Sequence, residues 1–488
     1  MTDTAQADTA QADTAQADTA QADTAQADTA QAYDQLLDGL RKTFRSGRTR
    51  SLDWRRDQLD ALLALLDENE KPIMDALAED LGRPPTEAYG ADIGQPKLEI
   101  RHARKNLERW ARPRRVLAPL TSQPGRAKIV AEPLGVALVI SPWNYPIQLL
   151  VNPLAAALAA GNCVVAKPSE LAPACSALLA GLVTSYLDTD AVAVIEGGVP
   201  ETSALLEQRF DHVFFTGSTR VGQVVMEAAA KHLTPVTLEL GGKSPTIVAA
   251  DADLAVAARR ITWGKYLNAG QTCIAPDYVL AEASIRDELV ERMVDVLGEF
   301  YGPDPRSSAS YGRIVNQSHF DRLVGLLGGD GAGEIVCGGE HDREQRFIAP
   351  TIVIDPSPSA PVMQDEIFGP VLPVLRVEDV GRAVEFVNDR PKPLALYLFS
   401  SSADTVEDVI EQTSSGGACV NHCVVHVLPS NLPFGGVGPS GMGAYHGKAG
   451  FDAFSHRKPV LTKPIWPDPK VMYPPYTELK DKVLRKAL

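Results

Sequence analysis

Apolar residues recur three and four positions apart over residues 33–110. This spacing places one apolar stripe along a helix, so the segment is predicted to form amphipathic helices. Ser51 precedes the strongest run and fits a helix N-cap, while Gly82 follows the run and fits a helix end. The apolar positions of that run are Leu52, Leu59, Leu62, Leu63, Leu66, Ile73 and Leu77.

From Val136 onward, short apolar runs alternate with helical stretches. The runs are rich in valine, and most of them end at Gly, Pro or Ser. Such alternation is typical of βαβ units, which build a parallel sheet covered by helices on both faces. The runs are VALVIS, NCVVAKPS, AVAVIEGG, HVFFTGS and TPVTLELGG.

A second alternating region begins at Pro245 and continues to the stretch GGACVNHCVV, with a helix predicted over residues 286–300. It is predicted to form another α/β layer with its own sheet. Two proline-rich segments, residues 112–135 and 455–476, are predicted to be extended. Because ligands of parallel sheets bind at the carboxyl ends of the strands, we expect the chemistry of this protein there.

The chain opens on a five-residue repeat, Asp-Thr-Ala-Gln-Ala, in six copies from Asp3 to Ala32. A period of five matches neither a helix nor a strand, and alanine is the only apolar residue in the repeat. Residues 1–32 are therefore predicted to be a low-complexity tail, disordered or transiently helical and without chemistry. A docking segment is the alternative.

The net charge of −15 argues against a nucleic acid or an anionic membrane as partner, because phosphate groups bind clustered Lys and Arg. Six cysteines in 488 residues are too sparse for a disulfide scaffold and favour a reducing cytoplasm. No signal peptide is expected. The stretch IQLLVNPLAAALAAG is interrupted by Asn152 and Pro153, so it is predicted to be a buried helix, not a membrane span.

Two predicted strand ends carry residues suited to a dinucleotide. In FTGSTRVG, Gly217 and Ser218 join a strand to a helix, where backbone N–H groups can bind a pyrophosphate. The three-glycine spacing of the usual fingerprint is missing, so a plain tight turn is the stronger local interpretation. In VVAKPSE, Lys167, Ser169 and Glu170 end a strand, and a lysine and a carboxylate there can bind ribose hydroxyls. For this stretch alone, a solvated turn with a surface ion pair is the favoured interpretation.

Three further turns carry candidate polar groups. Asn144 in SPWNYP could donate an amide N–H to a developing oxyanion, although asparagine is also common in turns. Glu239 ends the apolar strand of TLELGGKSP, where loss of water would raise its pKa toward that of a general base. In QDEIFGPVLPV, Glu366 and Phe368 could bind a ribose and pack beside a ring. A capped carboxylate and a turn over the core are the alternatives.

Cys273, in NAGQTCIAPDY, is an isolated cysteine, and isolated cysteines are more often small buried hydrophobes than nucleophiles. The stretch ACVNHCVVHV suggests metal ligands, with Cys419, His422, Cys423 and His426 close in sequence. We predict it to be a strand, in which the cysteines face one side and the histidines the other. No metal site is therefore expected.

Taken in order, these stretches resemble the aldehyde dehydrogenase superfamily from about Tyr33 to the C-terminus. The N-terminal region, EIFGPVLPV and the ending GVGPSGMGAYHGKAGFDAFSHRKPVL are most similar to the class three group. Members of that group oxidise medium-chain aliphatic and aromatic aldehydes with NAD or NADP. The motifs that carry the resemblance are PWNYP, KPSE, FTGSTRVG, LELGGKSP, GQTC, EIFGPVLPV and PFGGVGPSGMGAYHG.

The resemblance implies that Cys273 is the nucleophile, Glu239 the general base and Asn144 the side-chain donor of the oxyanion hole. A cysteine thiohemiacetal would be oxidised to a thioester, which Glu239-activated water would hydrolyse. The implied cofactor contacts are Trp143, Lys167, Ser169, Glu170, Gly217, Ser218, Gly222, Leu240, Glu366 and Phe368. The implied substrate contacts are Tyr145, Trp263 and Thr272.

The resemblance also implies an α/β fold: a Rossmann-like dinucleotide-binding domain, an α/β catalytic domain and a small β oligomerisation arm. The first would comprise residues 33–111 and 133–240, and the second residues 241–441. The arm would comprise residues 112–132 and 456–470, with a C-terminal return and tail over residues 442–455 and 471–488.

A carboxylate at position 170 should repel a 2′-phosphate, so NAD is expected to be preferred and NADP accepted. We expect a small-molecule aldehyde as substrate, a homodimer and a cytoplasmic location, without a membrane anchor because ELKDKVLRKAL is too charged and short. Two competing hypotheses are transfer of the acyl group to coenzyme A and a non-catalytic use of the fold. Glu239 argues against the first, and the intact set of Cys273, Glu239 and Asn144 argues against the second.

Overall fold

A computed structural model describes residues 31–487 of the chain. The predicted repeat tail, residues 1–32, lies outside the described residues except for its last two, which are helical. Residues 31–45 are helical and lead into a layer of helices. This layer consists of η1 (Arg48–Arg50), α2 (Leu52–Glu68), α3 (Glu70–Leu81), α4 (Pro85–Glu87), the π-helix η2 (Ala88–Gly94) and α5 (Gln95–Ala111).

The predicted ends of these helices are confirmed. The Ser51 hydroxyl accepts a hydrogen bond from the Trp54 N–H and caps α2. Gly82 ends α3 with a φ of 57°, a left-handed conformation that glycine adopts without a Cβ clash. The leucines of the predicted stripe that turn inward, Leu59, Leu62, Leu66 and Leu77, are fully buried.

A six-stranded sheet follows, in the order β17-β7-β6-β3-β4-β5, and all its pairings are parallel except that of β17 with β7. Strands β3, β4 and β6 are buried along their whole length, because helices cover both faces. The strands are β3 (Val136–Ile140), β4 (Cys163–Lys167), β5 (Val192–Val194), β6 (His212–Thr216), β7 (Val236–Glu239) and β17 (Gly441–Met442). The helices are α6 (Gln148–Ala160), α7 (Pro173–Tyr186), α8 (Val199–Leu206), α9 (Thr219–Ala230) and α16 (Gly447–Ala453).

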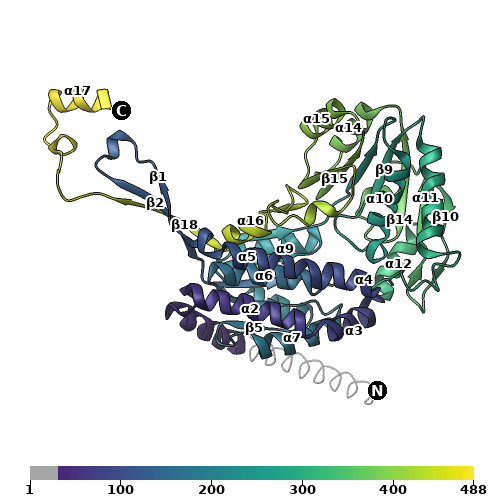
Figure 1. Cartoon of the computed structure of the whole chain (residues 1–488), viewed down its shortest axis with the longest axis horizontal. Coiled ribbons are helices and arrows are strands. Elements are labelled where there is room, and N and C mark those ends of the chain that lie inside the picture. The colour runs from purple at the N-terminus through teal and green to yellow at the C-terminus, as the bar shows by residue number, and fades with distance from the viewer. Residues whose placement is uncertain (1–30, 488) are drawn as a thin grey trace, which may run out of the picture.

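A seven-stranded sheet forms the second lobe, in the order β10-β13-β14-β9-β8-β15-β16, with only the β10–β13 pairing antiparallel (Figure 1). Its strands are β8 (Pro245–Val248), β9 (Tyr278–Glu282), β10 (Glu334–Cys337), β13 (Thr351–Ile354), β14 (Val371–Val377), β15 (Ala395–Phe399) and β16 (Gly417–Val420). A short hairpin, β11 (His341–Asp342) and β12 (Phe347–Ile348), lies beside them. The helical segments are α10 (Leu254–Tyr266), η4 (Leu267–Gly270), α11 (Arg286–Tyr301), α12 (Gln317–Gly325), α13 (Pro361–Gln364), α14 (Val380–Asn388), α15 (Ala403–Gln412) and η5 (Val425–Val427).

The two proline-rich segments meet in a third, three-stranded antiparallel sheet, which confirms that both are extended. Strand β2 (Arg126–Pro133) lies between β1 (Arg114–Val116) and β18 (Ser455–Thr462), with η3 (Leu120–Ser122) in the β1–β2 connection. This sheet projects from the body as an arm, and α17 (Glu478–Ala487) lies beyond it after η6 (Lys470–Met472) (Figure 1).

Two other sequence predictions have different outcomes. The apolar stretch from Ile147 forms α6, whose Asn152 and Pro153 are both buried, as predicted. No helix within residues 31–487 combines the length and the apolar character that a bilayer crossing requires. The predicted strand ACVNHCVVHV, by contrast, is wrong beyond Val420, because Asn421 and Val424 have positive φ values of 56° and 68° that break the pleat.

Candidate active site

A cavity of about 700 Å³ lies between the two lobes, at the carboxyl ends of β3, β6 and β7. Its walls come from the ends of β6 and β7 and from loops and helices of both lobes, and ligand sites of parallel α/β structures lie at such strand ends. Most of the predicted site residues line it. These are Trp143, Asn144, Gly217, Ser218, Glu239, Leu240, Cys273, Glu366 and Phe368.

Cys273 reaches the cavity from a tight turn that follows α10. Asn268 and Ala269 have left-handed backbones with φ of 52° and 51°, and Gly270 follows with φ of 76°. A Cβ at Gly270 would collide with the carbonyl of Gly369, so the turn requires glycine there. Burial raises the pKa of the Cys273 thiol, and the nearby carboxyl groups of Glu366 and Glu239 add to the shift.

Asn144 follows β3 and is buried beside the cysteine turn. Its side-chain amide donates a hydrogen bond to the Gln271 carbonyl at 3.0 Å. A primary amide carries two N–H groups, so one donor of Asn144 is still free to bind an oxygen in the cavity. The side chain is held by backbone two residues before Cys273, which gives a rigid donor rather than a mobile one.

Glu239 is the last residue of β7 and is 2% exposed. Neither of its carboxyl oxygens has a hydrogen-bond partner among residues 31–487. Burial raises the pKa of this carboxyl well above its ordinary value, because no neighbouring cation or donor offsets the loss of water. An unpaired, desolvated carboxyl group on a cavity wall is suited to proton transfer.

Aromatic side chains and a carboxyl group form another part of the cavity wall. The Phe368 ring meets the Trp143 ring edge to face, with centroids 5.3 Å apart. His319, from α12, packs on the other side of Trp143 at 5.0 Å. Burial, reinforced by Asp277, raises the pKa of Glu366 to about 8, so this carboxyl group is largely protonated at neutral pH.

The residues around α9 fit a dinucleotide. Ser218 caps the helix, its hydroxyl accepting the Val221 N–H at 3.4 Å, and the other N–H groups of the first turn face the cavity end of the sheet. A Cβ at Gly217 would meet the Phe215 ring, so glycine lets that ring pack against the turn. Gly222 lies one turn further on and does not line the cavity; a Cβ there would meet Leu240.

The predicted ribose residues at the end of β4 lie outside this cavity. The Lys167 ammonium donates to the carbonyls of Pro168 at 2.9 Å and Gly197 at 2.5 Å, and lies 3.8 Å from the Glu170 carboxylate. Glu170 keeps 42% of its side chain exposed. The Ser169 hydroxyl accepts the Leu171 N–H at 3.2 Å and thus stabilises the turn.

The three predicted substrate residues do not line the cavity either. The hydroxyl groups of Tyr145 and Thr272 lie 2.7 Å apart and are bonded to each other inside the protein. Trp263, on α10, is 38% exposed and meets the His422 ring edge to face at 5.7 Å. None of these three side chains therefore faces the cavity.

Several cavity residues carried no sequence signal that we recognised. His319 and Arg322 come from α12, a helix without a motif, and Arg390 and Lys392 come from a loop before β15. Phe434 and Tyr445 lie in the motif PFGGVGPSGMGAYHG, which indicated the family but not a role for either ring.

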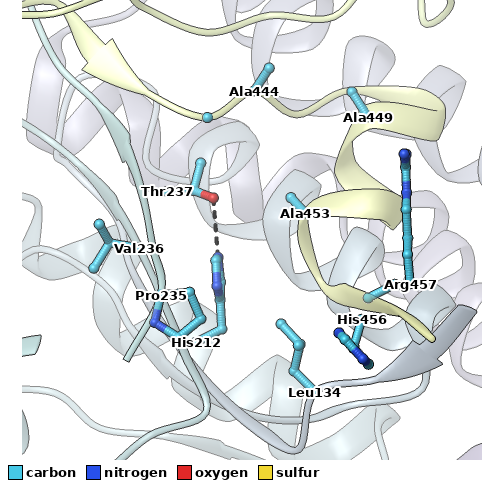
Figure 2. A pocket seen from close by; sticks show the side chains of 12 residues that line it. Leu134, His212, Pro235, Val236, Thr237, Ala444, Ala449, Ala453, His456 and Arg457 are labelled. Carbon is cyan, nitrogen blue, oxygen red and sulfur yellow. Dashed lines mark hydrogen bonds between the residues drawn. The ribbon is translucent and has the colours of Figure 1, made fainter. Parts of the chain in front are cut away.

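Among residues 31–487, no three His, Cys, Asp or Glu side chains gather in a way that would hold a metal ion. A second cavity of about 450 Å³ lies at the amino ends of β6 and β7 and shares no lining residue with the first (Figure 2). There the His212 ring lies 3.1 Å from the Thr237 hydroxyl, opposite Leu134, His456 and Arg457. No predicted site residue lines this second cavity.

Comparison with known proteins agrees with these features. The sequence pattern described as the Aldehyde dehydrogenase family matches residues 2–460. Aldehyde dehydrogenase family 3 member A2 of Rattus norvegicus is 50% identical over 443 residues, 90% of this chain and 91% of that protein. Aldehyde dehydrogenase, dimeric NADP-preferring, also of Rattus norvegicus, is 49% identical over 437 residues, 89% of this chain and 96% of that protein.

Among solved structures, the substrate-bound state of Staphylococcus aureus AldH matches with a TM-score of 0.90 and 42% identity, covering 93% of this chain and 99% of that chain. The predicted α/β fold and the predicted enzyme class are thereby confirmed. The chain belongs to the aldehyde dehydrogenase family, in its class 3 group, and is an NAD(P)-dependent oxidoreductase that converts aldehydes to acids.

Proposed function

We propose that the protein oxidises medium-chain aliphatic or aromatic aldehydes and that Cys273, Asn144 and Glu239 carry the reaction. The observation behind this proposal is that a thiol, a free amide donor and an unpaired carboxyl group line one cavity. The proposed substrate class rests on the resemblance to the class 3 group.

In the proposed mechanism, the Cys273 thiolate attacks the aldehyde carbon. The resulting oxyanion accepts hydrogen bonds from the free Asn144 N–H and from the Cys273 backbone N–H. After oxidation, the acyl group remains on Cys273 as a thioester. Glu239 then takes a proton from a water molecule, which attacks the thioester and releases the carboxylic acid.

The cofactor site is proposed to run from the α9 N-terminus to Glu366 and Phe368. NAD(P)+, when bound, supplies the acceptor for the hydride that leaves the substrate. Gly217 and Ser218 would hold the pyrophosphate, Lys167 and Glu170 the adenine-side ribose, and Glu366 the nicotinamide-side ribose. Trp143, Leu240 and Phe368 would pack against the rings, while Ser169 and Gly222 would support these contacts through the turn and the helix.

NAD is proposed to be preferred and NADP accepted. The Lys167 ammonium is influenced by three carboxylates, those of Glu170, Glu201 and Glu196. This surplus of negative charge disfavours a 2′-phosphate. One relative is named NADP-preferring, so acceptance of NADP is part of the proposal.

The substrate is proposed to approach Cys273 from the side of α10, where Trp263 is partly exposed. Tyr145 and Thr272 would then shape this passage from behind, through their mutual hydrogen bond. We also propose a cytoplasmic homodimer. All six cysteines are free, which suits a reducing compartment, and a relative is named dimeric.

Replacement of the cysteine tests the function. We expect Cys273→Ala to lose reduction of NAD with benzaldehyde or hexanal, because no other thiol lines the cavity in residues 31–487. The loss should be at least about 10³-fold, as for removal of a nucleophile. A variant that kept the parent rate would overturn the proposal, and a need for coenzyme A to form product would favour acyl transfer instead. Cys337→Ala, on β10, serves as the control.

A further inference from the structure

A segment of the N-terminal helical layer reaches between the two turns of the active site. It comprises Arg83, the short helix α4 and the π-helix η2. This segment belongs to neither large sheet, yet its charged side chains bond to the Asn144 turn and to the Cys273 turn. The mechanism proposed above uses none of these side chains.

Arg83 and Asp92 form a rigid frame on the Asn144 side. They make an ion pair with no side-chain exposure, and Arg83 also donates to the Asn144 carbonyl. The Asp92 carboxylate accepts the N–H groups of Ile147 and Gln148, both at 3.1 Å. A buried pair with most of its bonds satisfied resists rearrangement, so the Asn144 backbone is held in place.

A closed ring of hydrogen bonds then joins Asn144 to the cysteine turn. The Asn268 side-chain amide donates to the Asn144 carbonyl at 3.0 Å and to the Gln271 carbonyl at 3.2 Å. The Gln271 carbonyl in turn accepts the Asn144 side-chain amide at 3.0 Å. The relative position of the oxyanion donor and the nucleophile thus depends on Asn268.

Glu87 fixes Asn268 from outside this ring. Its carboxyl oxygen accepts the Asn268 backbone N–H at 3.0 Å. Asn268 and Ala269 both have left-handed backbones, a conformation that asparagine adopts readily but that costs energy for alanine. A charge-assisted bond to the first of them opposes relaxation of the turn.

We propose that Glu87 is a positioning residue. It holds the strained Asn268–Ala269 turn in place and thereby keeps Cys273 in the correct position relative to Asn144. The inference rests on the proposed roles of Cys273 and Asn144. Glu87 does not line the cavity and touches no reacting atom. Its loss should therefore lower the rate of the chemical steps without weakening the binding of substrate or cofactor.

The first test compares Glu87→Ala, Glu87→Gln and the parent full-length enzyme with hexanal and NAD. We expect Glu87→Ala to lower kcat about 10- to 100-fold per active site, as for a misplaced reacting group, while KM for both substrates stays near the parent value. Glu87→Gln, which keeps an acceptor for the Asn268 N–H, should recover most of the loss. Active sites are counted by the extent of Cys273 alkylation.

Asp211→Ala is the matched control. Asp211 is another partly buried carboxylate that accepts one backbone N–H, that of Val136 at 2.8 Å, but at the far end of β3. We expect this variant to be less stable than the parent and equal to it in kcat. Equal losses of kcat in both alanine variants, or a parent-like kcat in Glu87→Ala, would overturn the proposal.

A pH profile provides the second test and remains available if Glu87→Ala does not fold. Burial raises the pKa of Glu87 to about 7, and the Asn268 N–H and Arg83 oppose that shift. The carboxyl group should therefore ionise, and hold the turn more strongly, as the pH rises through neutrality. The charged and titratable groups near it are Arg83, Tyr145, Tyr301 and Tyr311.

Dividing the kcat of the parent by the kcat of Glu87→Gln removes the pH dependence that both enzymes share. We expect this ratio to be close to one near about pH 6 and to rise about 3- to 10-fold by about pH 8.5, since only the parent gains a charged acceptor. A ratio that does not change with pH would contradict the proposal. Failure of the proposed function is distinguishable, because Cys273→Ala would then stay active whatever the Glu87 variants do.

Discussion

At the scale of single residues, burial decides the chemistry of the candidate site. Glu239, Glu366 and Cys273 are all acidic groups whose pKa values lie above their ordinary values, chiefly because burial penalises the charged forms. The motif around Glu239 predicted a base with a raised pKa, and the direction of the shift agrees with that prediction. Burial of these groups lowers the free energy of unfolding at a pH where they would be ionised in the unfolded chain, because they are harder to ionise in the folded state.

Glu239→Gln should separate catalysis from stability. The raised pKa means that the folded protein favours the protonated carboxyl group, so the stability tied to Glu239 is complete below about pH 4.3 and falls as the pH rises toward the raised value. We expect the Tm of the variant, relative to the parent, to increase between about pH 5 and about pH 8. Turnover should fall about 10²- to 10⁴-fold, with acylated Cys273 detectable by intact mass.

The matched control is Glu227→Gln, on α9, whose side chain is exposed. It should change neither Tm nor turnover. A Tm difference for Glu239→Gln that is equal at both pH values would argue against the buried-carboxyl explanation.

At the scale of elements, the candidate site lies at the ends of strands. The apolar runs that the sequence predicts as strands stop at the same places as β3, β4, β6 and β7. One edge of the sheet therefore carries Asn144, Lys167, Gly217 and Glu239. The strand predicted over ACVNHCVVHV fails because two left-handed residues follow β16, and Asn421 bonds across to Ser400 at 3.0 Å instead of continuing the pleat.

The end of β4 should control the choice of cofactor. Glu170→Gln removes one of the carboxylates near Lys167, so the repulsion of a 2′-phosphate should decrease. We expect the ratio of kcat/KM for NADP to that for NAD to rise about 10-fold, mainly through the KM for NADP. Glu207→Gln, whose carboxylate pairs with Lys231 at 2.8 Å on the surface, is the control. A parent enzyme that uses NADP as well as NAD would contradict the proposed preference.

At the scale of the whole molecule, the sheet β1-β2-β18 projects from the body as an arm (Figure 1). Strand β18 pairs with β2 along its whole length, and the chain continues beyond it, outside the body (Figure 1). Ile465 is 97% exposed and Trp466 is 83% exposed. Apolar side chains that extend from the body in this way are typical of a surface covered by another copy.

We therefore expect the double substitution Ile465→Asp and Trp466→Asp to convert a dimer into a monomer, as measured by light scattering, because a desolvated interface does not tolerate two new charges. Ile410→Asp, at a 43% exposed apolar position on α15, should leave the mass unchanged. A parent enzyme that is already monomeric, or a double variant that stays dimeric, would rule out this use of the arm.

Local features of this protein were predictable from its amino-acid sequence: the helices of the N-terminal layer, the alternating strands, and the turns that hold Cys273, Asn144 and Glu239. These depend on neighbours a few residues apart, which periodicity and turn chemistry report directly. The sequence did not predict that Glu87 bonds to Asn268, 181 residues away, or that Arg322 faces the cavity; both follow from the packing of the folded chain. Such contacts depend on how distant elements pack, and burial then sets each pKa, so neither leaves a local pattern.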